Sequence, residues 1–88
     1  MKIARITGLM TATVKDMKLN GVKLLVADIE DGLGNPLESS VVVADTCGAG
    51  VGELVLVTTG SAARLPDGIA GLPVDLATIA VIDHLDIA

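Results

Sequence analysis

The sequence predicts an all-β fold: a small closed antiparallel barrel with at most one short helical turn. Short runs rich in Val, Ile, Leu and Thr alternate with turn signals built from Gly, Asn, Asp and Pro. Helical periodicity is not sustained over the length that a crossover helix needs, which excludes parallel βαβ units. The 88 residues leave room for a single small domain, which we expect to span residues 1–88.

Five strands are expected, each a short apolar or β-branched run bounded by turn residues. In chain order they cover residues 2–8, 22–29, 39–45, 53–59 and 78–87. Gly8 is expected to bend or bulge the first strand, which residues 9–14 then continue. Asn20–Gly21 marks a tight turn before the second strand. The glycines, acids and proline of residues 30–36 mark a hairpin-like turn before the third.

The remaining connections are expected to be loops. Residues 46–52 join the third strand to the fourth and contain three closely spaced glycines. Residues 60–73 are punctuated by prolines and glycines and lead to the last strand. Pro73 suits the start of a helix, so residues 74–77 are expected to form the one helical turn.

Four of the strands contain continuous apolar runs instead of the alternation that a half-exposed strand shows. The runs are residues 24–27, 41–44, 54–57 and 79–82. Neighbouring strand residues point to opposite faces, so these strands are apolar on both. One face can line the barrel, and partner subunits are the natural cover for the other because no helices are expected. The alternative is that small apolar side chains tolerate partial exposure.

The composition of the core also favours oligomerisation. The chain is 51% hydrophobic but has no Phe, Tyr or Trp, so its core is built from smaller side chains. Domains of this size usually need disulfides, metals or partner subunits for stability. A single cysteine forms no disulfide within the chain, and one cysteine with one histidine is a poor set of metal ligands. Association with partner subunits is therefore the expected source of additional stability.

The charge argues against several classes of function. The net charge is −5 and the six basic residues are scattered, so the basic stripe of a nucleic-acid-binding surface is missing. No aromatic side chain is present to stack on single-stranded bases. The acidic balance disfavours an anionic membrane surface, and no apolar run reaches the roughly 18 residues of a membrane span. A lone cysteine is typical of a reducing compartment, so a cytoplasmic location is expected.

The glycine cluster of residues 48–52 first suggests a phosphate site. A phosphate loop requires a lysine and a hydroxyl residue after its last glycine, whereas Glu53 stands there and would repel phosphate. A dinucleotide fingerprint requires a helix after it, whereas a β-branched run follows here. The cluster is therefore interpreted as a tight backbone junction.

No catalytic, cofactor-binding or metal-binding constellation is expected. Cys47 and His84 are a conceivable nucleophile and base, but a chance pairing is the better interpretation. Cys47 is expected to be a small buried or half-buried residue, and His84 a surface strand residue. Asp83 and Asp86 are expected to point to opposite faces of the last strand, so they do not form a carboxylate pair.

Arg64 is the single cation in the second half of the chain. Its guanidinium group is suited to holding a carboxylate across an interface. The alternative is an arginine in a solvated loop.

In the order of its segments, the chain resembles the bacterial microcompartment vertex proteins. This pentameric shell family includes carboxysome and ethanolamine-compartment vertex subunits. The resemblance is carried by residues 1–8, 19–25, 45, 48–53, 55–57, 60–64, 73–75 and 80–83. These segments cover nearly the whole chain. Leu54 stands where family members often have an aromatic residue, and Cys47 stands where they often have valine, alanine or a similar small residue.

The resemblance implies a barrel related to the oligonucleotide-binding fold, assembled as a homopentamer. It implies a structural protein, not an enzyme, that caps shell vertices among hexameric shell proteins, without nucleic acid or membrane partners. The glycine loop and the segment after the fourth strand are expected at the subunit interface or the five-fold axis. These candidates are Gly48, Ala49, Gly50, Gly52, Glu53, Gly60, Ser61 and Arg64. The alternative is a small barrel that binds nucleic acid or a small ligand.

Overall fold

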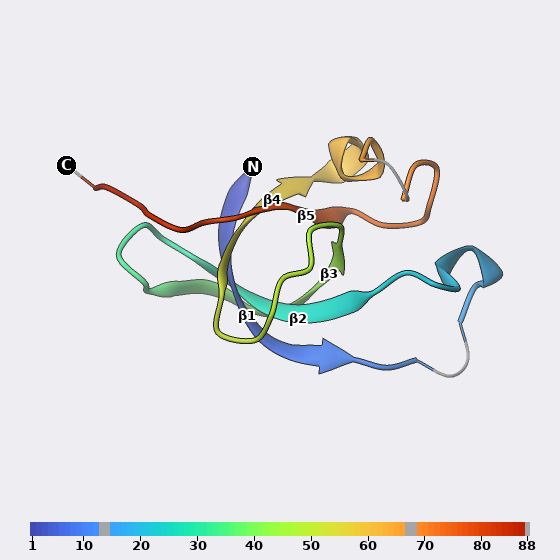
Figure 1. The fold of residues 1–88 in the computed structure, drawn as a ribbon, viewed down its shortest axis with the longest axis horizontal. Helices are drawn as coiled ribbons and strands as arrows, with labels where there is room; N and C mark the ends of the chain where they lie inside the picture. The colour runs from blue at the N-terminus through green and yellow to red at the C-terminus, as the bar shows by residue number, and fades with distance from the viewer. Residues whose placement is uncertain (13–14, 67–68, 88) are drawn as a thin grey trace.

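The computed structural model describes residues 1–12, 15–66 and 69–87. Five strands and two short 3-10 turns make up its regular structure (Figure 1). The strands are β1 (Lys2–Met10), β2 (Leu24–Glu30), β3 (Pro36–Asp45), β4 (Leu54–Thr59) and β5 (Leu76–Val81). The 3-10 turns are η1 (Met17–Leu19) and η2 (Gly60–Arg64). None of the helical segments described has the length or the apolarity needed to span a lipid bilayer.

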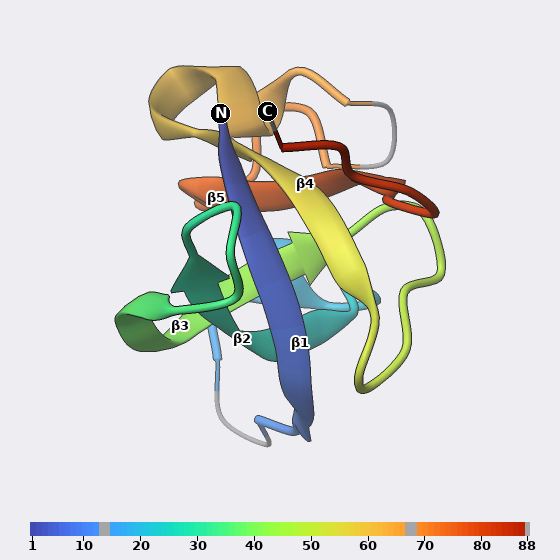
Figure 2. The ribbon, with the colours of Figure 1, turned by 90° about the vertical axis from the view of Figure 1, so that its left-hand side faces the viewer.

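The strands close into a barrel in the order β1-β2-β3-β5-β4, which confirms the predicted fold class. Figure 2 shows β1 and β4 crossing in front of the other three strands. Neighbours along this order pair antiparallel, except that β3 and β5 run parallel through a short contact at Ala44–Ala77 and Asp45–Thr78. The long excursion through η2 turns the chain before β5 and makes that single parallel contact possible.

The helical turn expected at residues 74–77 is wrong. Leu76 and Ala77 already belong to β5, where they pair with Thr59 and Thr58 of β4. Strand pairing therefore overrides the local preference that Pro73 suggests. The short helical segments lie instead at η1 and η2, and β5 ends at Val81, well before residue 87.

The bulge predicted in the first strand is confirmed at Gly8. The register between β1 and β2 shifts between Ile6 and Gly8, and β1 then continues to Met10. The predicted continuation through residues 13–14 lies outside the described residues.

The barrel interior is filled by aliphatic side chains from every strand except β5, which contributes partly buried residues. The largest fully buried apolar side chains are Ile6, Leu25, Val43, Val55 and Val57. Beneath η2 lies a second, smaller cluster, formed by Ala44, Ala63, Ile69 and Ala77.

Strands β2 and β3 also carry apolar residues on their outer face, as predicted. Leu25 and Ala27 point into the core, whereas Leu24 and Val26 alternate with them and are half-buried. Val26 pairs with Val42, which is 37% exposed. The outer face of this part of the sheet is therefore apolar and partly exposed at Val26 and Val42, whereas Leu24 packs against the second cluster.

Candidate functional site

The loop of residues 46–53 connects β3 to β4 and is organised around the carboxylate of Asp45. The side chain of Asp45 is 1% exposed. It accepts hydrogen bonds from the backbone N–H of Cys47 (3.2 Å), the N–H of Ala49 (3.1 Å) and the Thr78 hydroxyl (2.8 Å). Lys23 Nζ lies 3.4 Å from Asp45 Oδ2. An aspartate just before a glycine-rich loop commonly binds the backbone ahead of it, and here it holds the loop against β5.

Asp45 stays ionised despite its burial. Burial alone raises the pKa of this carboxyl, but the hydrogen bonds from Thr78, Cys47 and Ala49 and the charge of Lys23 outweigh it and hold the pKa below its ordinary value of 3.8. The negative charge is thus matched within the chain, so Asp45 stabilises the loop.

The second half of the loop is a turn braced by Glu53. Its side-chain Oε1 accepts a hydrogen bond from the Gly50 N–H (2.6 Å), and its own N–H donates to the Gly50 carbonyl (3.1 Å). Positive φ angles occur at Gly48 (+76°) and Gly52 (+90°), but not at Gly50. The interpretation of the cluster as a backbone junction is confirmed at Gly48 and Gly52, which adopt conformations that other residues avoid.

Arg5 of β1 joins the loop to the barrel, a role that the sequence did not reveal. Its Nη1 donates to the Gly52 carbonyl (3.0 Å), and its Nε lies 3.5 Å from Oε2 of Glu30 at the end of β2. The N–H of Gly52 in turn donates to the carbonyl of Ile6 (2.8 Å). No local sequence pattern predicts this contact, because Arg5 and Gly52 are far apart in the sequence.

Ala49 differs from the other loop candidates because it is buried in the barrel core of its own chain. It belongs to the same buried cluster as Val43 and Val55, so the loop also covers one end of the barrel interior. Gly48, Gly52 and Glu53 remain exposed around it.

The second predicted group lies in η2, directly after β4. Gly60 has a φ of +63°, and its N–H donates to the carbonyl of Asp75 (2.8 Å). Ser61 is exposed. Arg64 Nη1 donates to the carbonyl of Val74 (3.0 Å), so this guanidinium fastens η2 to the segment before β5.

The structure does not bring the two predicted groups together. The loop of residues 46–53 precedes β4 and η2 follows it, so the six residues of β4 separate them. A strand of that length spans roughly 20 Å. Figure 1 shows the loop and η2 at opposite ends of β4. Contacts with a neighbouring molecule at both groups would therefore be made at two separate places on the subunit.

Cys47 and His84 do not form a pair among the contacts of the described residues. Cys47 is exposed, which makes the expectation of a buried residue wrong, because the loop anchored by Asp45 turns it away from the core. Its sulfur lies 3.5 Å from the Thr78 hydroxyl. His84 is exposed but follows the end of β5, and its Nε2 lies 3.0 Å from Oδ1 of Asp86.

The carboxylates near the C-terminus lie outside the strand in which they were expected. Asp83 and Asp86 follow the end of β5, so the argument from opposite strand faces does not apply to them. In the parts of the chain that the structure describes, no three His, Cys, Asp or Glu side chains gather closely enough to hold a metal ion.

Comparison with known proteins assigns the chain to a family. The model of the family described as ethanolamine utilisation protein EutN/carboxysome matches residues 1–83. The chain belongs to this family. It is 41% identical to the carboxysome shell vertex protein CcmL of Synechocystis over 100% of this chain and 88% of that protein. It is 40% identical to the bacterial microcompartment shell vertex protein EutN of Salmonella typhimurium over 97% of this chain and 86% of that one.

A solved structure is also similar to the chain over its whole length. The GrpN pentameric microcompartment shell protein from Rhodospirillum rubrum matches with a TM-score of 0.89 and 34% identity, and 100% of each chain is covered. The resemblance that the sequence segments indicated is therefore confirmed, as is the barrel that it implied.

Proposed function

We propose that this chain is a structural subunit of a bacterial microcompartment shell, where it forms homopentamers that cap the vertices. The observation that carries the proposal is the full-length similarity to named shell vertex proteins and to a pentameric shell protein. The apolar pair Val26 and Val42 on the outer face of β2 and β3 agrees with it, because a single chain leaves these side chains partly exposed to water.

The pentamer would supply curvature to the shell. A flat layer of hexagonal tiles does not close on itself, whereas five-fold pieces at the corners allow closure. The partners of the pentamer are accordingly hexameric shell proteins. The subunit performs no catalysis, and the sequence-predicted residues act in assembly.

Within the pentamer, the exposed candidates Gly48, Gly52 and Glu53 and the half-buried Gly50 lie at the interface or the axis, and Gly60, Ser61 and Arg64 do so at the other end of β4. Ala49 acts from inside the barrel by holding the loop in shape. Two separated groups suit a ring, because each subunit meets one neighbour with one surface and the other neighbour with a different surface.

Electron microscopy of assembled shells tests the vertex role. We expect co-production of the chain with hexameric shell proteins to give closed polyhedral shells, with density for this chain at the five-fold corners. Omission of the chain is expected to leave shells that are open at their corners or elongated. Closed shells of the same form without the chain would contradict the proposal.

Binding to immobilised DNA and RNA at low salt distinguishes the alternative barrel function. The net charge of −5 predicts no retention on either. Retention that falls as salt is raised would support the nucleic-acid-binding alternative instead.

A further inference from the structure

The residues after β5 run along the outside of the barrel and reach the β2–β3 turn of residues 31–35. The N–H of Ile82 donates to the carbonyl of Leu54 in β4 (2.8 Å), which fixes the start of this segment. Ile87 lies against Gly32 in the turn. Figure 1 shows the segment, in red, running from β5 to the left, where the turn also lies. Residues 83–87 therefore form a strap between β4 and the turn.

Gly32 makes room for the strap. A Cβ atom at this position would lie 2.6 Å from Cδ1 of Ile87 and 3.3 Å from its Cγ1, so a larger residue does not fit beneath the isoleucine where it now lies. Glycine is needed either for a positive φ or for such a close approach. Gly34 in the same turn has a φ of +91°, whereas Gly32 has no positive φ. The missing side chain of Gly32 therefore serves the contact with Ile87.

The turn that receives Ile87 is held in shape by Asp31. Its Oδ1 accepts hydrogen bonds from the N–H groups of Leu33 (2.8 Å) and Asn35 (2.9 Å), and its Oδ2 accepts one from Nδ2 of Asn35 (3.0 Å). An aspartate that binds the backbone two residues ahead is typical of a fixed turn. Gly32 is therefore presented to the strap at a defined place.

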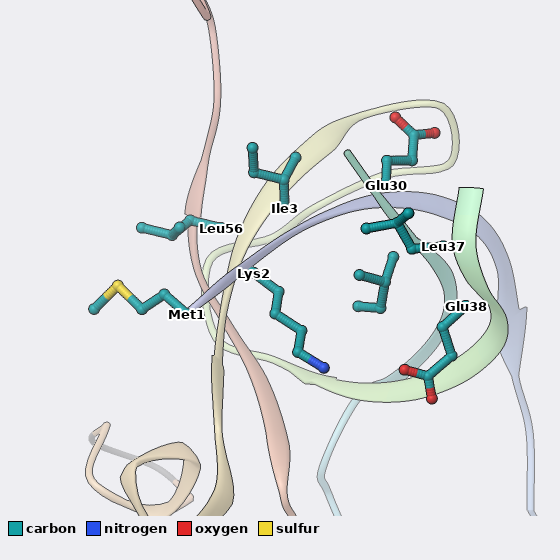
Figure 3. Close-up of a pocket in the computed structure, with 8 residues that line it drawn as sticks. Met1, Lys2, Ile3, Glu30, Leu37, Glu38 and Leu56 are labelled. Carbon is teal, nitrogen blue, oxygen red and sulfur yellow. The ribbon is translucent and has the colours of Figure 1, made fainter. Parts of the chain in front are cut away.

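A hollow of about 420 Å³ lies beside this turn, but the strap does not enter it. Glu30, Leu37 and Glu38, from the strands that flank the turn, line this hollow. Figure 3 shows these side chains at its opening. Ile87 is not part of the lining. The receptor of the strap is therefore the turn itself, at Gly32.

The strap is held by little besides this contact. Among the hydrogen bonds of the described residues, the one that involves residues 83–87 joins the side chains of His84 and Asp86 (3.0 Å). Ile87 is 54% exposed, and Gly32 is half-buried. Segments with few buried apolar contacts and exposed backbone groups open at a low cost in free energy. The strap can therefore open while the barrel stays folded.

The strap also forms one wall of a charged hollow beside the loop of residues 46–53. This hollow has a volume of about 360 Å³. Its lining includes residues of the strap, of the loop and of β1: Asp83, His84, Leu85, Gly52, Glu53 and Arg5. Arg5 fastens the loop by its hydrogen bond to the Gly52 carbonyl (3.0 Å). Opening of the strap therefore removes a wall next to the contact that holds the loop.

We propose that residues 83–87 are a releasable strap, closed by Ile87 on Gly32, that shields the charged hollow and the contact of Arg5 with the loop of residues 46–53. The structure shows the closed state. In the open state the strap leaves the turn and the hollow loses one wall, while the five strands stay paired. The contact lies within one chain, so this inference goes beyond the proposed function and does not rest on the pentamer.

A disulfide between the two contact positions tests whether the strap closes on its own chain. Gly32→Cys and Ile87→Cys are combined with Cys47→Ala, and the whole chain is oxidised in air with copper phenanthroline. Cγ1 of Ile87 lies 3.3 Å from the Cβ position of residue 32, so the introduced Cβ atoms come near the separation of roughly 3.5–4.5 Å that a disulfide spans. We expect the intact mass of the single chain to fall by two hydrogens.

The same protein is expected to run as a monomer on a non-reducing denaturing gel. Leu65→Cys with Ile87→Cys, in the same Cys47→Ala chain, is the control and should stay reduced, because Leu65 directly follows η2, which lies away from the end of the strap in Figure 1. Covalent oligomers of the Gly32→Cys, Ile87→Cys chain would show that the strap reaches a neighbouring copy. Free thiols after oxidation would show that the contact does not form. Either result overturns the proposal.

Gly32→Ala tests the release of the strap. The added Cβ meets the movable end of the Ile87 side chain and no backbone atom, so the turn keeps its fold and Ile87 is displaced. We expect the Cδ1 methyl resonance of Ile87 to shift in the NMR spectrum and to lose its nuclear Overhauser contact with residue 32. The Gly52 N–H, which donates to Ile6, is expected to exchange with solvent several-fold faster. Leu33→Ala, in the same turn, is the matched control and should change neither readout.

Ile87→Ala removes the same contact from the other side. It is expected to accelerate exchange of the Gly52 N–H as much as Gly32→Ala does, and the double variant should exchange no faster than either single variant. The remaining amide resonances check that the barrel stays folded. Exchange at Gly52 that is unchanged in both single variants, or an Ile87 methyl resonance that Gly32→Ala does not move, would overturn the proposal.

Discussion

The buried carboxylate of Asp45 stabilises the conformation of a loop and has no catalytic role in our account. Its carboxylate is covered by protein and accepts hydrogen bonds from two backbone N–H groups of the following loop and from Thr78 of β5. Lys23 compensates the charge. A buried carboxylate in a small barrel can suggest catalysis, but this one is fully engaged in holding the loop of residues 46–53. The missing aromatic core makes such polar anchors more important.

We expect Asp45→Asn to destabilise the fold by about 2 kcal/mol near neutral pH, since hydrogen bonds to a charged group are worth about 1.5–3 kcal/mol each. The folded-state pKa of Asp45 is lowered, so its contribution is present above the ordinary pKa of 3.8 and is lost as pH falls through the lower folded-state value. Urea unfolding at fixed protein concentration, measured from pH 7 down to pH 3, checks this. The difference between parent and variant should shrink only toward the acidic end, and a difference independent of pH would contradict the assigned role.

The loop between β3 and β4 is an element whose glycines serve different purposes. Gly48 and Gly52 supply positive φ angles, whereas Gly50 has an ordinary backbone conformation. At Gly50 an added Cβ would lie 3.3 Å from Oε1 of Glu53, the flexible end of a side chain. Sequence spacing alone does not distinguish the positive φ of Gly48 and Gly52 from the ordinary backbone of Gly50.

Substitution of these glycines by alanine separates the two cases. We expect Gly52→Ala to cost about 1–2 kcal/mol of unfolding free energy, because its φ of +90° is strained for a residue with a Cβ. Gly50→Ala is the matched control and should cost less, since Glu53 only has to shift slightly. Thermal unfolding of the two variants beside the parent chain measures the difference. Equal costs at the two positions would show that φ is not the deciding factor.

At the level of elements, the sequence predicted the strands well where the apolar run was uninterrupted. The runs of β2 and β4 and the bulge at Gly8 were visible because β-branched residues and glycine act locally. The start of β5 was missed, since Leu76 and Ala77 are strand residues only through their pairing with β4.

The contacts of the loop were less predictable than the strands. Arg5 and Lys23 come from β1 and from the segment before β2, and they reach the loop through the closed barrel. Periodicity and turn signals describe neighbours in sequence, so they do not report contacts that closure of the barrel creates. The burial of Ala49 was also unpredictable from the sequence. A small residue between glycines is typical of an exposed loop, and Ala49 is buried only because the closed barrel brings it into the core.

The whole molecule is a barrel with apolar residues inside and out. Its core contains no aromatic residue, and its outer surface exposes Met1, Leu37 and Val42. A subunit of this kind gains stability by association, and its unfolding temperature then rises with protein concentration. The exposed apolar side chains and the core without aromatic residues therefore favour a subunit of an assembly over an independent monomer.

Native mass spectrometry of the unmodified chain at micromolar concentration tests the central claim most directly. The account predicts one dominant species with five times the mass of the 8.9 kDa chain, and dissociation that removes single subunits from it. A stable monomer, or a dominant dimer, at the same concentration would contradict the claim that this chain forms the pentamer of a shell vertex.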